Sequence, residues 1–322
     1  MYEQIASNKR RAVLYAFVFF LMWLAIGGIL GWITVAVSAS RTPAYHPNYW
    51  GAIAAGAAVT AVLALLAIAY AVTSGTHLVL AVSGARPADP VQYRQLHNLV
   101  EEMAIAGGLP KPAVYVIDDP SPNAFATGTS PKKAAITATS GLLDIMNRDE
   151  LEGVLGHEMS HIKNYDVRLL LIVSTLIGLA GLLASIVWRN AFWMRGGDDD
   201  SGRAMIVVFA AGALLGLVAL VFGPLIRLAL SRRREELADV SSVELTRNPE
   251  GLLSALKKLQ QNDKPFKKFN HATAAMCIDD PLQHHESWFH HLFDSHPPIE
   301  ERIAVLERLL NTKTAPGSTQ GA

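Results

Sequence analysis

The segment His157-Glu158-Met159-Ser160-His161 has the residue types and the spacing of a metal site on a helix. Histidines four residues apart lie on one face of a helix, so both imidazoles of such a pair can bind one cation. Glu158 lies about 100° further round the helix, where it can reach a metal-activated water without binding the metal itself. The segment therefore predicts a metal centre in which Glu158 is a general base, taking a proton as water attacks a carbonyl.

A catalytic site of this kind needs a third protein ligand and an open position for water. The stretch 234–239 is the best source, because it offers carboxylates to complete a set of two histidines and one acid. Glu235 and Asp239 share one helix face, so Glu235 can bind the metal while Asp239 accepts a hydrogen bond from His157 and fixes its tautomer. Residue types and spacing do not decide between Glu235 and Glu236 as the ligand.

Four apolar runs must position these residues. They cover 12–37, 51–73, 169–188 and 205–226, and none contains a charged residue. Each is as long as the roughly 20 residues that a helix needs to cross a bilayer, which favours four transmembrane helices over buried core helices. The first run is too long for a cleaved signal peptide, so we expect it to be retained.

The charge of the chain supports a membrane protein and excludes a nucleic-acid binder. Charged residues make up 17% of the 322 residues, whereas soluble proteins have about a quarter. Lys and Arg number 28, as do Asp and Glu, so the chain has no basic excess with which to bind nucleic acid. The lipid bilayer is therefore an expected partner and nucleic acid is not.

Basic residues flank the runs unevenly. They occur at 9–11 before the first run and again at 227–234 after the fourth, whereas the loop 189–204 has three arginines beside three aspartates. The balance predicts that both termini are cytoplasmic. Segments 74–168 and 231–322 then lie on the same side, and the metal site lies just beneath the bilayer surface.

Segment 74–168 is predicted to be α+β. After a linker at 86–90 we expect a helix at 91–106, strands at 113–117 and 134–139, and a short helix at 142–146. Asn147 is expected to cap the motif helix, with Glu150 completing a capping box. Segment 231–322 is predicted to be helical, ending in a helix at 299–310 and a disordered tail at 311–322.

Several ordered motifs resemble those of the HtpX-like membrane metalloproteases, which are relatives of the CAAX prenyl endopeptidases. The motifs are 123–128, 139–143, 155–166, 234–239 and Ser295-His296-Pro297-Pro298 followed by Arg302. The resemblance implies an α-helical membrane protein with a zincin-like α+β domain and four transmembrane helices. It also implies zinc bound by His157, His161 and Glu235, which favours Glu235 over Glu236, with Glu158 as the catalytic base.

The predicted parts of such a protein follow the apolar runs. They are a hairpin at 1–73, a zincin-like part with the motif helix at 74–168, a second hairpin at 169–230, a helical part with the third ligand at 231–310, and the tail at 311–322.

The same resemblance implies a place and an activity. It places the enzyme in the bacterial inner membrane with a cytoplasmic active site. It implies ATP-independent endoproteolysis of misfolded or damaged membrane proteins, as protein quality control under stress, with self-cleavage as a further activity. Residues Asn123, Ala124, Phe125 and Ala126 resemble the edge strand that pairs with an extended substrate, which fits recognition by β-augmentation.

For three groups of residues the sequence leaves two interpretations open. His296 is either a group that stabilises the tetrahedral oxyanion or a residue at a helix start before Pro297. The histidines of 284–291 form either a polar lid, which we favour, or a second metal site. Asp166 either orients the end of the motif helix or faces solvent.

Two other functions compete with proteolysis. A membrane scaffold could keep a metal site for folding alone, but such a site has no need of a base like Glu158 next to its ligands. A transporter is disfavoured because the four apolar runs contain no ionisable residue to mark a pathway.

Overall fold

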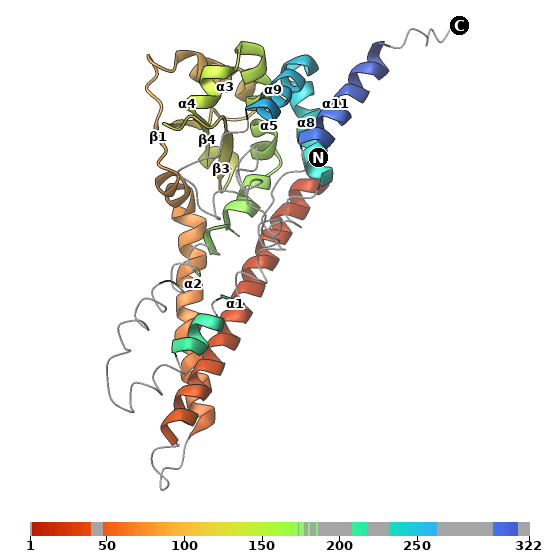
Figure 1. Ribbon diagram of the computed structural model, residues 1–322. Helices are drawn as coiled ribbons and strands as arrows, with labels where there is room; N and C mark the ends of the chain where they lie inside the picture. Colours follow the sequence, from red (N-terminus) through yellow and green to blue (C-terminus); the bar gives the residue numbers. More distant parts are fainter. Residues whose placement is uncertain are drawn as a thin grey trace, which may run out of the picture.

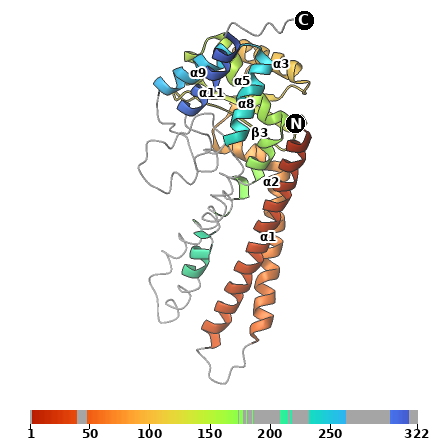
Figure 2. The same ribbon diagram turned by 90° about the vertical axis from the view of Figure 1, so that its right-hand side faces the viewer.

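The computed structural model of the protein describes residues 2–39, 48–172, 174–176, 180, 185, 208–214, 216–217, 232–262 and 299–314. Figure 1 shows a head of helices and a small sheet at one end of a long helical hairpin. The hairpin consists of α1 (Tyr2–Ala39) and α2 (Tyr49–Val82), and the start of α1 lies beside the head. Figure 2 shows the same arrangement after a quarter turn.

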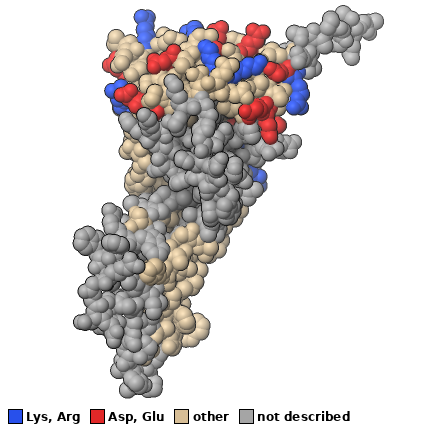
Figure 3. Space-filling model, in the orientation of Figure 1, with Lys and Arg blue, Asp and Glu red and all other residues tan. Residues whose placement is uncertain are grey.

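Both helices of the hairpin are long and apolar enough to cross a membrane, over Ala6–Ala36 and Tyr49–Val82. Large apolar side chains are exposed along them, including Phe17, Leu21, Trp32, Val59 and Leu66. Figure 3 shows charged side chains gathered over the head, whereas the visible described surface of the hairpin is almost free of them. These two candidate membrane helices coincide with the first two predicted runs, although α2 continues beyond the predicted end at residue 73.

The third and fourth predicted spans lie largely outside the described residues. Their described parts, 169–172, 174–176, 208–214 and 216–217, are helical. Two candidate membrane helices are therefore found in the described part of the chain, rather than the four that were predicted.

Small residues let α1 and α2 pack backbone against backbone. A Cβ atom added at Gly27 would overlap the carbonyl oxygen of Gly56 and the hydroxyl of Thr60. A Cβ added at Gly31 would likewise overlap the carbonyl oxygen of Ala52. Close contact of this kind drives helix association in lipid, where apolar burial contributes little.

Replacing Gly27 by alanine is therefore expected to destabilise the hairpin by about 1–3 kcal/mol, the usual cost of overpacking. Gly28→Ala is the matched control, because its added methyl group would lie 3.3 Å from a side-chain methyl of Ile53. Alanine also has the higher helix propensity, so the control is expected to unfold at the wild-type temperature or slightly above it. Thermal unfolding of both variants in detergent makes the comparison, and equal midpoints would contradict the close packing.

The head contains a four-stranded mixed sheet in the order β1-β2-β4-β3. Its strands are β1 (Arg86–Pro87), β2 (Ala113–Ile117), β3 (Ala124–Gly128) and β4 (Ala134–Thr139). The central pair β2/β4 is parallel and the outer pairs are antiparallel. The two strands predicted at 113–117 and 134–139 are confirmed, but residues 86–87 form a short strand within the predicted linker.

Helices cover the sheet and complete the head. They are α3 (Arg94–Gly107), α4 (Ser140–Ile145), α5 (Arg148–Lys163), α8 (Arg232–Thr246), α9 (Pro249–Gln261) and α11 (Ile299–Thr314), with a 3-10 turn at Pro131–Lys133. One core joins α3, α5, α9 and the sheet through Leu99, Met103, Ile136, Leu155 and Leu256. The final helix α11 runs to Thr314, four residues into the segment that was predicted to be disordered.

The motif helix α5 begins and ends at specific signals. Asn147 and Glu150 form the predicted capping box at its start. At its other end Tyr165 has φ of 61°, a left-handed conformation that breaks the helix, and helical backbone resumes at Asp166. The motif helix therefore does not run unbroken into the third apolar run.

Glycines on α5 bring α8 and α9 close to the motif. A Cβ at Gly153 would overlap the backbone of Leu252 on α9, and one at Gly156 would contact Ser242 on α8 too closely. The Ser242 hydroxyl also donates a 2.7 Å hydrogen bond to the Gly153 carbonyl. The two helices that carry the histidine motif and Glu235 are thereby held against each other.

Candidate metal centre

Three buried ligand groups converge where α5 meets α8. The Nε2 atoms of His157 and His161 lie 3.1 Å apart. A carboxylate oxygen of Glu235 lies 3.5 Å from Nε2 of His157, and the other oxygen lies 3.6 Å from Nε2 of His161. Tetrahedral zinc with bonds of about 2.0–2.1 Å places its ligand atoms about 3.3 Å apart. These three residues therefore form a group that can hold a metal ion.

The hydrogen bonds on the far side of each imidazole test whether a cation fits. Nδ1 of His157 lies 2.8 Å from Asp239, and Nδ1 of His161 lies 3.2 Å from Asp166. Each Nδ1 therefore donates its proton to a carboxylate, which leaves the Nε2 lone pairs facing each other. The two Nε2 atoms and the Glu235 carboxylate then face one buried place, and a divalent cation there would bind both lone pairs and balance the negative charge, so the donor set fits such an ion.

The His157 side of the site is completed by Arg302 from α11. Arg302 makes a two-pronged ion pair with Asp239, with Nη2–Oδ1 at 2.7 Å and Nε–Oδ2 at 3.1 Å. Burial raises the pKa of the Asp239 carboxyl, but the charges of Arg302 and His157 outweigh this effect and lower the pKa to about 2. Asp239 is therefore a fixed anion that holds the His157 ring, which is the contact that the sequence predicted for it.

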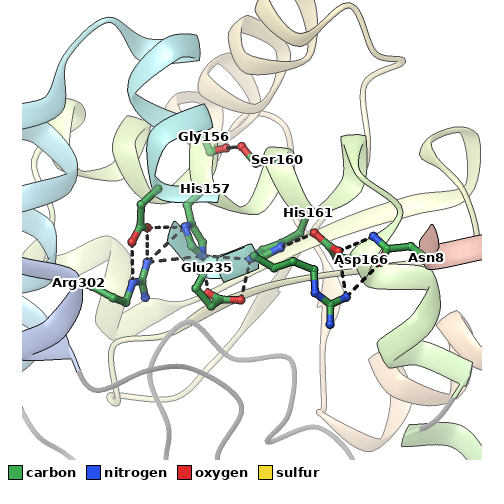
Figure 4. Close-up of polar contacts among 10 residues, drawn as sticks. Asn8, Gly156, His157, Ser160, His161, Asp166, Glu235 and Arg302 are labelled. Carbon is green, nitrogen blue, oxygen red and sulfur yellow. Dashed lines mark hydrogen bonds and ion pairs between the residues drawn. The ribbon is translucent and has the colours of Figure 1, made fainter. Parts of the chain in front are cut away.

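The His161 side is completed by Asp166 and Arg234. The break at Asn164–Tyr165 turns the chain so that Asp166 comes back to His161 (Figure 4). Asp166 is 2% exposed and also pairs with Arg234 at 3.3 Å, so its interpretation as a solvent-facing residue was wrong. Burial lowers the pKa of His161, but Glu235 and Asp166 outweigh this and raise the pKa to about 9. The raised pKa shows that this side of the site favours positive charge.

Glu158 lies close to the candidate ligands and to strand β3. It is 2% exposed, and burial raises its pKa above the ordinary value, although the nearby histidines oppose the shift. The backbone N–H of Ala126 in β3 donates a hydrogen bond to the Glu158 carboxylate. Its Oε1 has no hydrogen-bond partner among the described residues. Glu158 is thus oriented by β3 and keeps one oxygen available to accept a proton.

Backbone alternation decides which groups of β3 face away from the sheet. The N–H of Thr139 donates a hydrogen bond to the carbonyl of Asn123. In an antiparallel pair every second residue is hydrogen-bonded to the neighbouring strand, so the backbone groups of residues 123, 125 and 127 point toward β4. The backbone groups of Ala124 and Ala126 then point away from β4, to the side of β3 that pairs with no strand of the described sheet. There the Ala124 N–H donates a hydrogen bond to the side-chain oxygen of Asn123. All five residues of β3 are buried, so this edge is covered.

Some of the predicted site residues do not join this cluster or lie outside the described residues. Glu236, the alternative ligand, is exposed on α8, whereas Glu235 is fully buried. His296 and the histidines of 284–291 lie outside the described residues. Sequence reasoning missed Arg234, which directly precedes Glu235, and it missed Asn8, which lies in the first turns of α1 and gave no sign of a role.

The chain is similar to a known protein family and to several of its members. Residues 90–310 match the model of peptidase family M48. The chain is 41% identical over 317 residues to "Protease HtpX homolog" of Levilactobacillus brevis and 40% identical over 315 residues to that of Streptococcus mutans, covering 96% of this chain and 100% of each relative. A crystal structure of S. mikatae Ste24p aligns with a TM-score of 0.46 at 18% identity, over 95% of this chain and 67% of that one.

Proposed function

The chain belongs to peptidase family M48 and is a metalloprotease, and from this premise we propose that it is a zinc-dependent endopeptidase of the bacterial inner membrane. Its substrates are misfolded or damaged membrane proteins, cut on the cytoplasmic side as protein quality control. The observation that carries the proposal is the convergence of two imidazole Nε2 atoms and a carboxylate beside a buried glutamate. Two histidines and one carboxylate are a common ligand set of catalytic zinc.

The residues of this chain divide the chemistry between them. His157, His161 and Glu235 would hold the cation, which when bound supplies a Lewis acid that activates water and polarises the carbonyl of the peptide bond. Glu158 accepts the proton of the attacking water at Oε1 and then delivers it to the leaving amine. Burial raises the pKa of Glu158, and this suits the first step, because a more basic carboxylate takes up a proton more readily.

The substrate is expected to lie along β3 as an extended strand. The outward carbonyls of Ala124 and Ala126 would accept hydrogen bonds from its backbone, which holds a peptide with little regard to its sequence. The Ala126 N–H is bonded to Glu158, so β3 would align the peptide and the base together. Because β3 is buried, pairing requires an opening of the chain that covers this edge.

The position of the site supports substrates in or near the membrane. Asn8 of α1 contacts Asp166, which in turn contacts the metal ligand His161. The uncharged part of α1 begins at residue 12, four residues or about 6 Å further along the helix. The basic residues at 9–11 between them favour the cytoplasmic face, which would put the active site directly below the bilayer on that side.

Removal of the metal tests the proposal. The full chain, purified in detergent and stripped with a chelator, is expected to lose cleavage of casein, because the carbonyl and the water are then no longer activated. Cleavage should return on addition of one equivalent of zinc but not of magnesium, which prefers oxygen ligands. Undiminished cleavage by protein shown to be metal-free would contradict the proposal.

A further inference from the structure

Asn8 in the first turns of α1 reaches across the fold to the residues that support the metal site. Its Nδ2 donates a 2.7 Å hydrogen bond to Oδ1 of Asp166 and a 3.0 Å bond to the carbonyl of Asn164. Its Oδ1 accepts a 3.3 Å hydrogen bond from Arg234. Asp166 in turn accepts the Nδ1 proton of His161, which lies 3.2 Å away (Figure 4).

The partners of Asn8 allow only one orientation of its amide group. The NH₂ group faces two acceptors and the oxygen faces the Arg234 cation. A flipped amide would set its oxygen against the Asp166 carboxylate and its NH₂ group against the guanidinium. Asn8 and Asp166 are each 2% exposed and Arg234 is 6% exposed, so water cannot replace these bonds cheaply.

The two histidines are supported in parallel, and among the described residues the support of His161 extends to the hairpin. Each ring donates to a carboxylate that is paired with an arginine: Asp239 with Arg302, and Asp166 with Arg234. On the His157 side the arginine makes a two-pronged contact of 2.7 and 3.1 Å. On the His161 side the arginine makes one 3.3 Å contact with the carboxylate, and the shortest bond to Asp166 comes from Asn8.

We propose that Asn8 is a positioning residue for the metal centre, holding the Asp166 carboxylate against Nδ1 of His161 so that Nε2 points at the cation. The first apolar helix is then part of the support of the active site as well as a membrane anchor. This inference rests on the proposed function only for the identity of the cation. Loss of the Asn8 bonds leaves Oδ1 of Asp166 with the longer 3.3 Å contact to Arg234, so the carboxylate and the His161 ring are held less firmly.

A general anchoring role for α1 predicts a different set of effects. Lys9, the next residue, lies 4.3 Å from the centre of the Tyr165 ring, so it docks the same helical turn onto the same break in the chain. Lys9 is exposed, and no contact of it with Asp166 or His161 is found among the described residues. If α1 acted only as an anchor, loss of the Lys9 contact would weaken the metal site as loss of Asn8 does.

The test compares Asn8→Leu, which has a similar size but no polar atoms, with Lys9→Gln in the full chain in detergent. Zinc affinity is measured by competition with a chelator, and the geometry of the site by the visible spectrum of the Co²⁺-loaded protein. Asn8→Leu is expected to weaken zinc binding about tenfold, at the lower end of effects seen for groups behind metal ligands, and to shift the Co²⁺ spectrum. Lys9→Gln is expected to leave both at wild-type values.

A double variant tests whether Asn8 acts through Asp166. Asp166→Asn alone is expected to weaken zinc binding by about 10–100-fold, and adding Asn8→Leu should change it less than about twofold further. Additive losses would overturn the proposed route. Should Asn8→Leu fold poorly, Asn8→Ser, whose side chain is too short to reach both partners, carries the same expectation.

The outcomes separate this inference from the proposed function. Wild-type zinc affinity and an unchanged Co²⁺ spectrum in Asn8→Leu would overturn the positioning role and leave the protease proposal intact. A wild-type protein that binds zinc but leaves casein uncut would remove the proposed function, while the effect of Asn8 on the metal would still stand.

Discussion

Glu158→Gln is expected to lower the rate of casein cleavage by about 10³-fold while the protein keeps its zinc. A positioned general base contributes about 10²–10⁴ to such rates. Glutamine has the same shape and can still accept the hydrogen bond from Ala126, but it cannot take a proton from water. The measurement is kcat for the variant and the wild type at saturating casein, together with zinc content per chain.

The matched control for this variant is Glu152→Gln on the same helix. The pKa of Glu152 is also raised by burial, but Glu152 is not among the metal ligands or their hydrogen-bond partners. Its replacement is expected to leave kcat within about twofold of the wild type, within the small effects of substitutions away from special sites. A zinc-loaded Glu158→Gln protein that cleaves casein at the wild-type rate would remove Glu158 from the mechanism.

Local signals in the sequence were sufficient for most elements of the head. Strands β2 and β4 follow from β-branched and small residues between turn signals, and their bounds agree with the structure. The start of α5 follows from Asn147 and Glu150, because a capping box is formed by residues three apart. These features depend on neighbours in the chain, and therefore can be predicted without knowledge of the fold.

The break after the motif helix could not be predicted in this way. No glycine or proline stands between the motif and the third apolar run, so the residues there give no local signal for a break at 164–165. Tyr165 instead adopts a left-handed conformation, which is unfavourable for a residue with a large side chain. Asn8 bonds the residues on either side of it, Asn164 and Asp166, from a helix more than 150 residues away in the sequence.

The difference between local and tertiary signals also explains which residues of the site could be predicted from the sequence. The two histidines are joined by helical spacing, and Asp239 by helical spacing to Glu235. The arginines that hold the carboxylates come from other helices, and their partners are set by tertiary packing alone. Helical spacing can therefore identify the carboxylate that orients a histidine, as it did for Asp239. The arginine that holds this carboxylate in place can be identified only from the fold.

Glu235→Ala is expected to weaken zinc binding by more than about 100-fold, which exceeds the usual effect of changing a group behind a ligand. The variant removes one of three converging ligand groups from a fully buried position. It also removes the carboxylate of the ligand cluster, so that two imidazoles alone remain to hold the cation. Zinc per chain after gel filtration and affinity by chelator competition measure the effect, and casein cleavage should fall to background.

Glu236→Ala is the matched control, since Glu236 is the next residue on α8 and is exposed. Neighbouring residues on a helix point about 100° apart, so the change alters the same helix without touching the cluster. Zinc affinity and casein cleavage are expected to stay at wild-type values. If Glu236→Ala lost the metal and Glu235→Ala retained it, the third ligand would be Glu236, and α8 would have to turn by about 100° from its position against α5 to bring it there.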